Sequence, residues 1–527
     1  MTVISLDDRL KPTIKIVSHK ERTMHLNKSI KDPRFLLLYS PQWFDKRFGA
    51  VKPEGSLGIA YVAGALKNSG YDVSILDCCV GNARYSLQET FYHTTPRDNG
   101  MVRVGMNTDD ILKEAEDFNV IGISSIFTAQ TKMVEETVSA LAHAYPEKLI
   151  ILGGVNARSQ LDRFFDAGAH VICMSEAETT IIEIANLLRE GKSDFSTVRG
   201  VAFKKNAQVH ITHAALTLTD LDDLPIPAWD ILPLQRYWEI ARPHGSVFSQ
   251  DNPYRYASAM TSRGCPFRCH YCHISLEKAK KDLFGTIGAL RLKTPERVIQ
   301  EMLLLKELGV EYVLLEDDSL LGKRARAMQI FKLIKDLHLR LGDVNGINLA
   351  HMFSMQNGKL AVDEQLMEAM VSAGFEDLQF PVESGSQRII DAYATGKLNL
   401  EKHDITALIK KAKEMGIKVG GNYTFGYPDE TLDEMQSTID IAKLHMDAGL
   451  DKANFMIITP FPGTQFYDYA VTHDLFLPGI DIGVLDWMRP SIKTLIAPAT
   501  LEHVITEVWR DINNPKRINR LRSMTPR

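Results

Sequence analysis

Three cysteines lie close together in the middle of the chain, within the sequence TSRGCPFRCHYCHIS. Cys265, Cys269 and Cys272 follow the spacing C-x3-C-x2-C, and they are half of the six cysteines in the protein. Thiolates this close in sequence can bind one metal centre, but a structural zinc ion and a cubane iron–sulfur cluster each require four ligands. The spacing therefore predicts a metal centre with one ligand still to be supplied.

Two kinds of centre fit this spacing. In the first, His270 or His273 is the fourth ligand and the loop binds zinc. In the second, the fourth position of a [4Fe–4S] cluster stays open for another molecule. Zinc sites usually combine two separated ligand pairs, whereas these cysteines fall within eight residues and no second pair follows. The spacing favours the cluster.

The composition is that of a folded, water-soluble protein with more than one domain. The 527 residues are 45% hydrophobic and 24% charged, and the net charge of −5 offers no basic surface for nucleic acid. No apolar stretch reaches the roughly 18 residues that span a bilayer, and the polar start is unlike a signal peptide. An iron–sulfur cluster requires a reducing compartment. We therefore expect a cytoplasmic protein that binds neither nucleic acid nor membranes.

Strands and amphipathic helices alternate in the first part of the chain. Apolar runs such as FLLLYS, VIGISSI and LIILGG alternate with helical patterns such as KMVEETVSALAHAY. This alternation predicts a parallel sheet with helices on both faces, a doubly wound (Rossmann-like) α/β fold. Such sheets bind ligands beyond the carboxyl ends of their strands, although ordinary loop tips are also small and polar. The residues expected there include Ser124, Ser125, Gly153, Gly154 and Glu176.

Six strands with intervening helices are predicted in the second part, the third of them at 346–352. Six strands are too few for an eight-stranded barrel, so the pattern predicts a partial (β/α)6 barrel that resembles a TIM barrel opened on one side. Chemistry in such barrels lies at the carboxyl ends of the strands. The second strand ends in Asp317 and Asp318, whose carboxylates need a cation unless they simply reach solvent at the rim.

The cysteine loop resembles the signature of the radical S-adenosylmethionine (SAM) enzymes, including the lead-in SRGCPFRC and Tyr271 before the last cysteine. Two later stretches resemble the same family, FPVESGSQR and NYTFGYPDET. The resemblance implies that Cys265, Cys269 and Cys272 bind a [4Fe–4S] cluster whose open iron binds SAM. It further implies that the SAM site is formed by Asp317, Asp318, Glu383, Ser384 and Gly426.

The first domain resembles the cobalamin-binding domain of one branch of these enzymes. The matching stretches are SLGIAYVAGALKNSGYDV, ISSIF, and LGG followed by Arg158. The chain departs from the family at Asn156, where histidine is frequent, and at Ser175, where glycine is usual. The resemblance implies that cobalamin is bound by Ser124, Ser125, Gly153, Gly154 and Glu176. With no family-type histidine to reach cobalt from below, we expect base-off binding.

The resemblance also divides the chain and gives it a function. We expect an N-terminal arm (1–33), a cobalamin-binding domain (34–194), a linker (195–250), a radical SAM core (251–474) and a small C-terminal helical cap with a tail (475–527). The implied function is a cobalamin-dependent radical SAM methyltransferase that methylates an unactivated carbon of a small natural-product or phosphonate-like molecule. An external one-electron donor of the flavodoxin or ferredoxin type would serve it. The alternatives are a cyclase or rearrangement enzyme without methyl transfer, and a non-enzymatic corrinoid-binding sensor.

Overall fold

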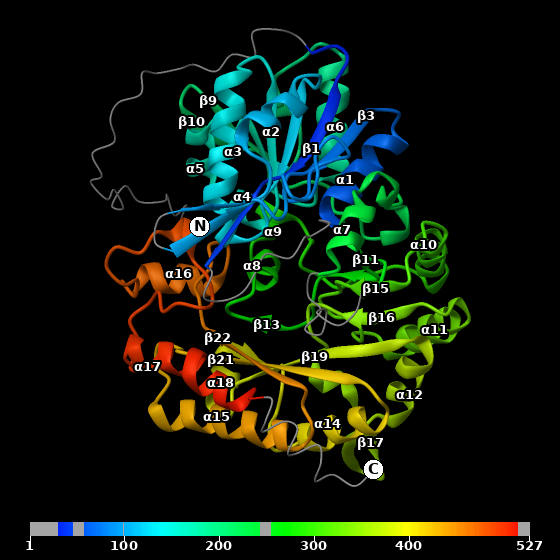
Figure 1. Ribbon diagram of the computed structural model, residues 1–527, viewed down its shortest axis with the longest axis vertical. Helices are drawn as coiled ribbons and strands as arrows, with labels where there is room; N and C mark the ends of the chain where they lie inside the picture. The colour runs from blue at the N-terminus through cyan, green and yellow to red at the C-terminus, as the bar shows by residue number, and fades with distance from the viewer. Residues whose placement is uncertain (1–29, 46–56, 98–99, 243–253, 515–527) are drawn as a thin grey trace.

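The computed structural model describes residues 30–45, 57–97, 100–242 and 254–514. The expected N-terminal arm therefore lies almost entirely outside the described residues, and so does the end of the expected C-terminal tail, residues 515–527. Figure 1 shows the described chain as two units, one coloured mainly blue to cyan and the other mainly green to orange.

A seven-stranded sheet forms the centre of the first unit, in the order β10-β9-β8-β7-β6-β1-β3. Its parallel strands are β1 (Arg34–Tyr39), β3 (Asp72–Asp77), β6 (Val120–Ser124), β7 (Leu149–Gly153) and β8 (Val171–Cys173). Side chains of β1 alternate between two cores, with Phe35 and Leu37 in one and Leu36 and Leu38 in the other. The predicted doubly wound sheet is confirmed.

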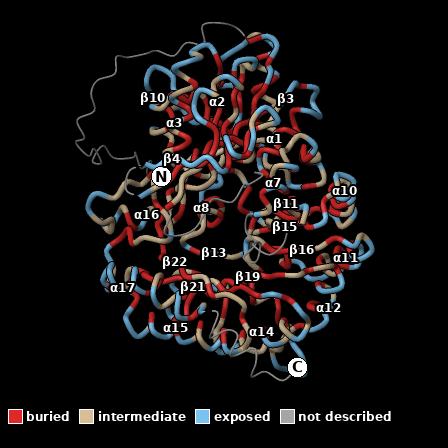
Figure 2. The backbone as a smooth tube through the Cα atoms, in the orientation of Figure 1, coloured by how far each residue is buried: buried red, intermediate tan, exposed pale blue. Residues whose placement is uncertain are grey.

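Helices cover both faces of this sheet. On one face, α1 (Leu57–Asn68) packs against α6 (Ala177–Arg189). On the other face, α3 (Thr131–Ala144) packs against α2 (Thr108–Ala115) and α5 (Leu161–Ala167). A hairpin from the segment expected to be the linker extends this sheet, since β9 (Val201–Lys205) and β10 (Gln208–Ile211) continue it from β8 in antiparallel fashion. The strands are consequently buried between helices, as Figure 2 shows.

The second unit contains six parallel strands that follow one another in chain order. They are β11 (Tyr256–Ala259), β15 (Tyr312–Leu315), β16 (Arg340–Asp343), β19 (Phe375–Glu383), β21 (Lys418–Phe425) and β22 (Lys452–Ile457). The helices between them are α10 (Pro295–Glu307), α11 (Arg324–Ile334), α12 (Glu364–Ala373), α14 (Ile405–Glu414) and α15 (Leu432–Asp447). Within the described chain, β11 and β22 do not pair with each other, so the predicted partial barrel is confirmed.

The third barrel strand is not where the sequence predicted it. Strand β16 covers Arg340–Asp343, whereas the apolar stretch 346–352 contains no strand and ends in a short 3-10 helix, Leu349–Met352. The strand RLGD lacks an apolar run because its glycine is required: a Cβ at Gly342 would lie 2.2 Å from the Tyr312 hydroxyl. The apolar residues that misled the prediction reach the core from the loop instead.

The C-terminal part of the chain contacts both units. Asp481 forms ion pairs with Arg163 and Lys132 of the first unit. Further on come α17 (Pro498–His503) and α18 (Trp509–Ile512). Helix α18 lies along the last barrel strand, where the Trp509 indole donates a hydrogen bond of 2.9 Å to the Ala453 carbonyl, and it covers an edge that would otherwise be exposed. Across the described ranges, none of the helices combines the length and apolarity needed to cross a membrane.

Candidate functional site

The cysteine loop follows β11 and lies at the carboxyl end of the barrel. Its entry requires Gly264, which has φ +78° and whose Cβ would lie 2.2 Å from the Ala289 carbonyl oxygen. The Lys278 ammonium donates a 2.8 Å hydrogen bond to the carbonyl of Cys265, and so holds the loop from below. Burial raises the pKa of all three thiols, Cys265, Cys269 and Cys272.

The donor set of this loop fits an iron–sulfur cluster better than a zinc ion. Among the residues that the structure describes, no three His, Cys, Asp or Glu side chains surround a point closely enough to hold one metal ion. The thiolates that bind a cubane cluster lie farther apart than those that bind a single ion, because each thiolate binds a different iron. Both candidate histidines have other neighbours: His270 is exposed beside the Tyr393 ring, and the Nε2 of His273 is 3.8 Å from Glu277.

Two acidic residues after β15 support the loop. The carboxylate of Asp317 is buried and accepts hydrogen bonds from the amide and hydroxyl of Thr261, at 2.9 and 2.7 Å, and from the Ser262 hydroxyl. Asp318 accepts a 3.0 Å hydrogen bond from the Gly264 amide, and burial raises its pKa. Asp317 is thus committed to the entry of the loop, while Asp318 lies nearer the cysteines and is half-buried.

Glu383 ends β19 in a strained conformation. Its φ of +69° is unusual for a residue with a side chain, and such strain is concentrated at functional sites. Its carboxylate forms an ion pair with Lys397 and accepts a 3.3 Å hydrogen bond from the Thr424 hydroxyl. The neighbouring Ser384 is fully buried, with its hydroxyl 3.2 Å from that of Thr438. The two residues of the ESGS stretch therefore have different surroundings.

Lys397 is a site residue that the sequence did not reveal. Burial alone would lower its pKa, but Glu383 and the thiolate of Cys269 hold the pKa above its ordinary value. The lysine follows the short strand β20 (Ala394–Thr395), which pairs with Arg268–Cys269 of the cysteine loop. Nothing in the local sequence distinguishes it from a surface lysine, because only this pairing brings it to the cysteines.

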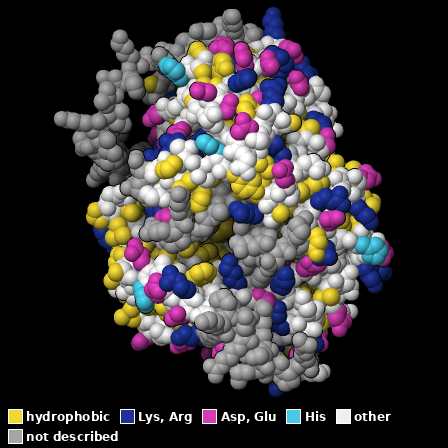
Figure 3. Space-filling model, viewed as in Figure 1, with side chains coloured by type: hydrophobic (Ala, Val, Ile, Leu, Met, Phe, Trp, Pro, Cys, Tyr) yellow, Lys and Arg dark blue, Asp and Glu magenta, His cyan; other side chains and the backbone are white. Residues whose placement is uncertain are grey.

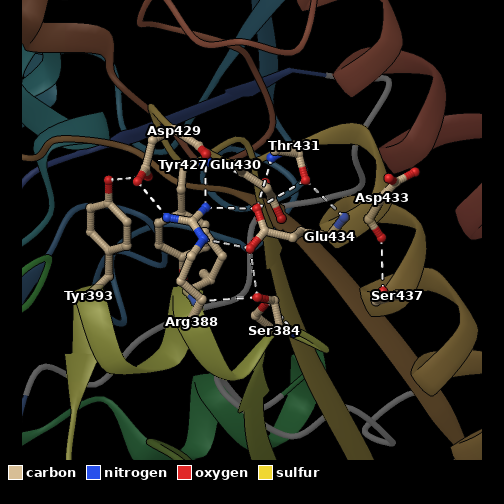
Figure 4. Close-up of polar contacts among 12 residues, drawn as sticks. Ser384, Arg388, Tyr393, Tyr427, Asp429, Glu430, Thr431, Asp433, Glu434 and Ser437 are labelled. Atoms are coloured by element: carbon tan, nitrogen blue, oxygen red, sulfur yellow. Dashed lines mark hydrogen bonds and ion pairs between the residues drawn. The ribbon is translucent and has the colours of Figure 1, made fainter.

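A polar network joins the two later motifs, as Figure 4 shows. Arg388, in α13 (Gln387–Tyr393), forms ion pairs of 2.6 Å with Asp429 and 2.7 Å with Glu434. The Tyr393 hydroxyl donates to Asp429 at 2.7 Å. The ESGSQR stretch and the GYPDET turn are therefore tied together at the surface of the barrel.

Below this network, Gly426 forms a tight turn after β21. Its φ is +83°, and a Cβ would lie 2.9 Å from a methyl group of Leu501 in α17. The Gly426 amide donates a 2.5 Å hydrogen bond to Glu430, a fully buried carboxyl group. Burial raises the pKa of Glu430 to about 7. The turn therefore has no side chain at Gly426, and its backbone amide is held by the buried carboxyl group of Glu430.

The first unit offers a different kind of edge. Strand order reverses between β1 and β6, and doubly wound sheets bind ligands in the crevice at such a point. Ser124 ends β6, and the buried hydroxyl of Ser125 accepts a 2.7 Å hydrogen bond from Asn156. A Cβ at Gly154 would lie 2.3 Å from the Ser125 carbonyl oxygen, whereas one at Gly153 would meet no atom within 4 Å.

This edge fits a large, flat ligand such as a corrinoid. The open backbone at Gly153 permits close approach, and Ser40, at the end of β1, has a buried hydroxyl with no hydrogen-bond partner in the described part of the chain. Figure 3 shows a recess in this face of the molecule, between the two units, with hydrophobic side chains visible inside it. Four of the predicted corrinoid residues thus lie on one edge: Ser124, Ser125, Gly153 and Gly154.

Glu176, the fifth predicted corrinoid residue, has charged partners instead. Its carboxylate forms ion pairs with Arg291, at hydrogen-bond distance, and with Arg263, at 3.3 Å. Burial would raise the pKa of Glu176, but the two arginines hold it below its ordinary value. Since both arginines belong to the barrel unit, this carboxylate joins the units.

Two protein families match the chain in the order that the fold shows. The B12 binding domain matches residues 52–185, and the radical SAM superfamily matches residues 260–442. The chain belongs to the cobalamin-dependent radical SAM enzymes. The first match contains the doubly wound sheet's ligand edge, and the second contains the cysteine loop and both later motifs.

Relatives with curated names agree with this assignment. The cytidylyl-2-hydroxyethylphosphonate methyltransferase of Streptomyces wedmorensis is 28% identical over 78% of this chain and 76% of its own length. An uncharacterized methyltransferase of Pyrococcus horikoshii is 27% identical over 86% of this chain and 84% of its own. Both names are those of methyltransferases, and the two matched domains give this chain a [4Fe–4S] cluster, SAM and cobalamin as its cofactors.

Solved structures share the fold at low sequence identity. The cobalamin-dependent SAM radical enzyme OxsB, with aqua-cobalamin and SAM bound, has a TM-score of 0.66 at 16% identity, covering 94% of this chain and 70% of that one. The radical SAM methyltransferase TsrM from Kitasatospora setae has a TM-score of 0.60 at 16% identity, covering 89% and 82%. Both support the two-unit architecture.

Proposed function

We propose that this enzyme transfers a methyl group to an unactivated carbon of a small natural-product or phosphonate-like molecule. The observation that supports this most directly is the contact between the two units, in which Arg263, two residues before the first cysteine, forms a 2.5 Å ion pair with Glu178 of the first unit. The cysteine loop is therefore held beside the edge that fits a corrinoid. The phosphonate class rests on the name of the Streptomyces relative alone.

Residue roles follow from the contacts. Cys265, Cys269 and Cys272 would hold the cluster, with Lys397 and Lys278 placing positive charge beside the loop. When bound, the cluster supplies an electron to cleave SAM and cobalamin carries the methyl group. Asp318, Glu383 and Gly426 are the predicted residues best placed to contact SAM, whereas Asp317 and Ser384 support the loops from which those contacts come.

We propose the division of the chain that the sequence predicts, with the corrinoid domain at 34–194, the linker at 195–250 and the radical SAM core at 251–474. An external one-electron donor of the flavodoxin or ferredoxin type would reduce the cluster. This is supported by the exposure of Arg268 and His270, which flank Cys269 at the surface. Since such a cluster needs a reducing compartment, we propose a cytoplasmic location.

An anaerobic assay tests the function. The protein is reconstituted with iron, sulfide and hydroxocobalamin, reduced in the presence of SAM, and assayed for 5′-deoxyadenosine, S-adenosylhomocysteine and bound corrinoid. Both SAM products together with methylcobalamin are expected. Formation of 5′-deoxyadenosine alone, despite bound corrinoid and with candidate phosphonates supplied, would instead support radical cyclisation or rearrangement, and no SAM cleavage at all would support a corrinoid sensor.

A further inference from the structure

Four charged side chains meet between the two units. Glu176 and Glu178 come from the start of α6 in the first unit, and Arg263 and Arg291 come from the barrel unit. Arg263 is paired with Glu178 at 2.5 Å and with Glu176 at 3.3 Å, and Arg291 is paired with Glu176. The side chains of Arg263, Arg291 and Glu178 are 11%, 5% and 7% exposed, so water screens these pairs poorly.

The two arginines need the two carboxylates. They face each other directly in a two-stranded antiparallel ribbon, formed by β12 (Ser262–Arg263) and β14 (Arg291–Leu292). Like charges in directly opposite positions of a ribbon repel each other. The ribbon can keep this register while buried only if negative charge lies beside it, and Glu176 and Glu178 provide that charge. The geometry at the entry of the cysteine loop thus depends on a turn of the other unit.

A second contact supports the same ribbon. The Arg263 guanidinium lies 4.6 Å from the centre of the Tyr61 ring in α1, and the Tyr61 hydroxyl accepts a 2.7 Å hydrogen bond from Lys293. Helix α1 is the first helix after β1 in the described chain, and α6 is the first after β8, so both helices start at the ligand edge of the first sheet. The ribbon is therefore in contact with two elements whose starts lie where a corrinoid would bind.

We propose that Arg263 and Glu178 are positioning residues that couple corrinoid binding in the first unit to SAM binding at the cluster. This inference rests on the proposed function. A ligand that orders the start of α6 would fix the carboxylates, and these fix the ribbon that enters the cysteine loop. Because such coupling is reciprocal, SAM bound at the cluster strengthens corrinoid binding by the same factor.

Another contact between the units provides a matched control. Asp481 pairs with Arg163 at 2.9 Å and with Lys132 at 2.7 Å, and it joins the C-terminal segment to α3 and α5. These side chains are 28% to 39% exposed, and the ion pairs and hydrogen bonds that the described structure gives them involve no residue of the cysteine loop. If docking of the units were all that mattered, weakening this contact would have the same effect as weakening the buried one.

The experiment measures the dissociation constant of SAM for the anaerobic, cluster-reconstituted protein with and without hydroxocobalamin, together with the electron paramagnetic resonance (EPR) spectrum of the reduced cluster. The variants are Arg263→Gln with Glu178→Gln as a double substitution, which leaves no unpaired charge, and Asp481→Asn as the control. In the wild type, corrinoid is expected to tighten SAM binding at least about fivefold. In the double variant this factor should fall close to one, while cluster content and corrinoid binding persist. Asp481→Asn should keep the wild-type factor.

Other outcomes separate the two levels of argument. A wild-type factor of one, a double variant that keeps the wild-type factor, or equal loss in Asp481→Asn would each overturn the coupling while leaving the proposed function intact. A wild-type protein that binds no corrinoid would overturn both. If the double variant does not fold, Arg263→Lys replaces it, because lysine keeps the charge but has one nitrogen where the guanidinium uses two for Glu176 and Glu178. The factor by which corrinoid tightens SAM binding should then lie between one and the wild-type value. An unchanged factor would overturn the inference.

Discussion

The barrel mouth and the ligand edge of the first sheet are built by opposite means. At the mouth, charged groups that are buried and fully engaged hold the cysteine loop, as Asp317 does with three hydrogen bonds and Lys397 with Glu383. At the edge, the residues are small and uncharged, and Gly153 leaves open space where a side chain would be. The structure of the mouth therefore depends on hydrogen bonds and ion pairs between specific side chains, whereas the edge depends on small residues that leave space for a ligand.

This difference implies two kinds of sensitivity. Removing one member of a buried charged set leaves the other groups without partners in a poorly hydrated place, which is costly. Adding atoms to the edge fills space meant for a ligand but leaves the fold intact. Substitutions should therefore affect the two regions through different measurements, and four predictions test this.

Cys269→Ala should abolish reductive cleavage of SAM, because two thiolates and an open iron cannot hold a stable cubane cluster. Corrinoid binding should persist, since the ligand edge lies in the other unit. The measurement is 5′-deoxyadenosine formation alongside the absorption of bound cobalamin. Cys78→Ala, at a buried position outside the cysteine loop, is the matched control and should keep SAM cleavage. Cleavage retained by Cys269→Ala would sink the assignment of the cluster.

Glu430→Gln should flatten the pH dependence of stability. The pKa of Glu430 is raised from 4.5 to about 7, so the folded protein holds a proton that the unfolded chain releases between these values. Stability is therefore highest below pH about 4.5 and falls as the pH rises to about 7, by about 3 kcal/mol. Glutamine stays neutral, so this part of the loss should vanish. Thermal unfolding of wild type and variant at pH 5 and pH 8 measures this loss of stability. If the melting temperature fell equally between the two pH values in wild type and variant, the assignment to Glu430 would be contradicted.

The sequence predicted those parts of the site whose residues are near one another in the chain. The C-x3-C-x2-C spacing, Glu383 in its motif and Gly426 in its turn could all be read locally, and the alternation of strands and helices predicted both sheets. The predicted position of the third barrel strand was wrong because the strand contains Gly342, where a side chain would collide with the Tyr312 hydroxyl. A pattern of apolar residues does not reveal such a contact.

Residues brought together by tertiary pairing could not be predicted. Arg263 and Glu178 are 85 residues apart, and Lys397 reaches Glu383 only because β20 pairs with the cysteine loop. Glu176 was predicted as a corrinoid residue from its motif, but the motif carries no information about the arginines opposite it. Charged partners that only tertiary pairing brings together, within the barrel or between the units, are thus the class of contact that local patterns miss.

Gly153→Leu should weaken corrinoid binding by about tenfold to a hundredfold, since an inserted side chain competes for the space where the ligand approaches. Thermal stability and corrinoid-independent SAM cleavage should stay close to wild type, because a Cβ at this position meets no atom of the protein. Absorption titration with hydroxocobalamin measures the affinity. The neighbouring Gly154→Leu is the contrast: with φ +106° and the Ser125 carbonyl 2.3 Å from its Cβ, it should lose stability as well. Unchanged affinity in Gly153→Leu would move the corrinoid away from β7.

Arg388→Ala should have the smallest effect, although Figure 4 shows Arg388 at the centre of the polar network that joins the two later motifs. Its side chain is 48% exposed, so its ion pairs with Asp429 and Glu434 are screened by water and should contribute less than about 1 kcal/mol. The difference in melting temperature between this variant and the wild type should shrink further in 0.5 M salt. At that concentration the Debye length is on the order of a few Å, so surface ion pairs are screened more strongly. Asp317→Asn, which replaces a buried carboxylate that accepts three hydrogen bonds where Arg388 donates four, should lose several times more stability and also cluster content. If the two variants lost equal stability, burial would not be what separates supporting charges from surface ones, and the contrast between mouth and edge would have to rest on the number of contacts instead.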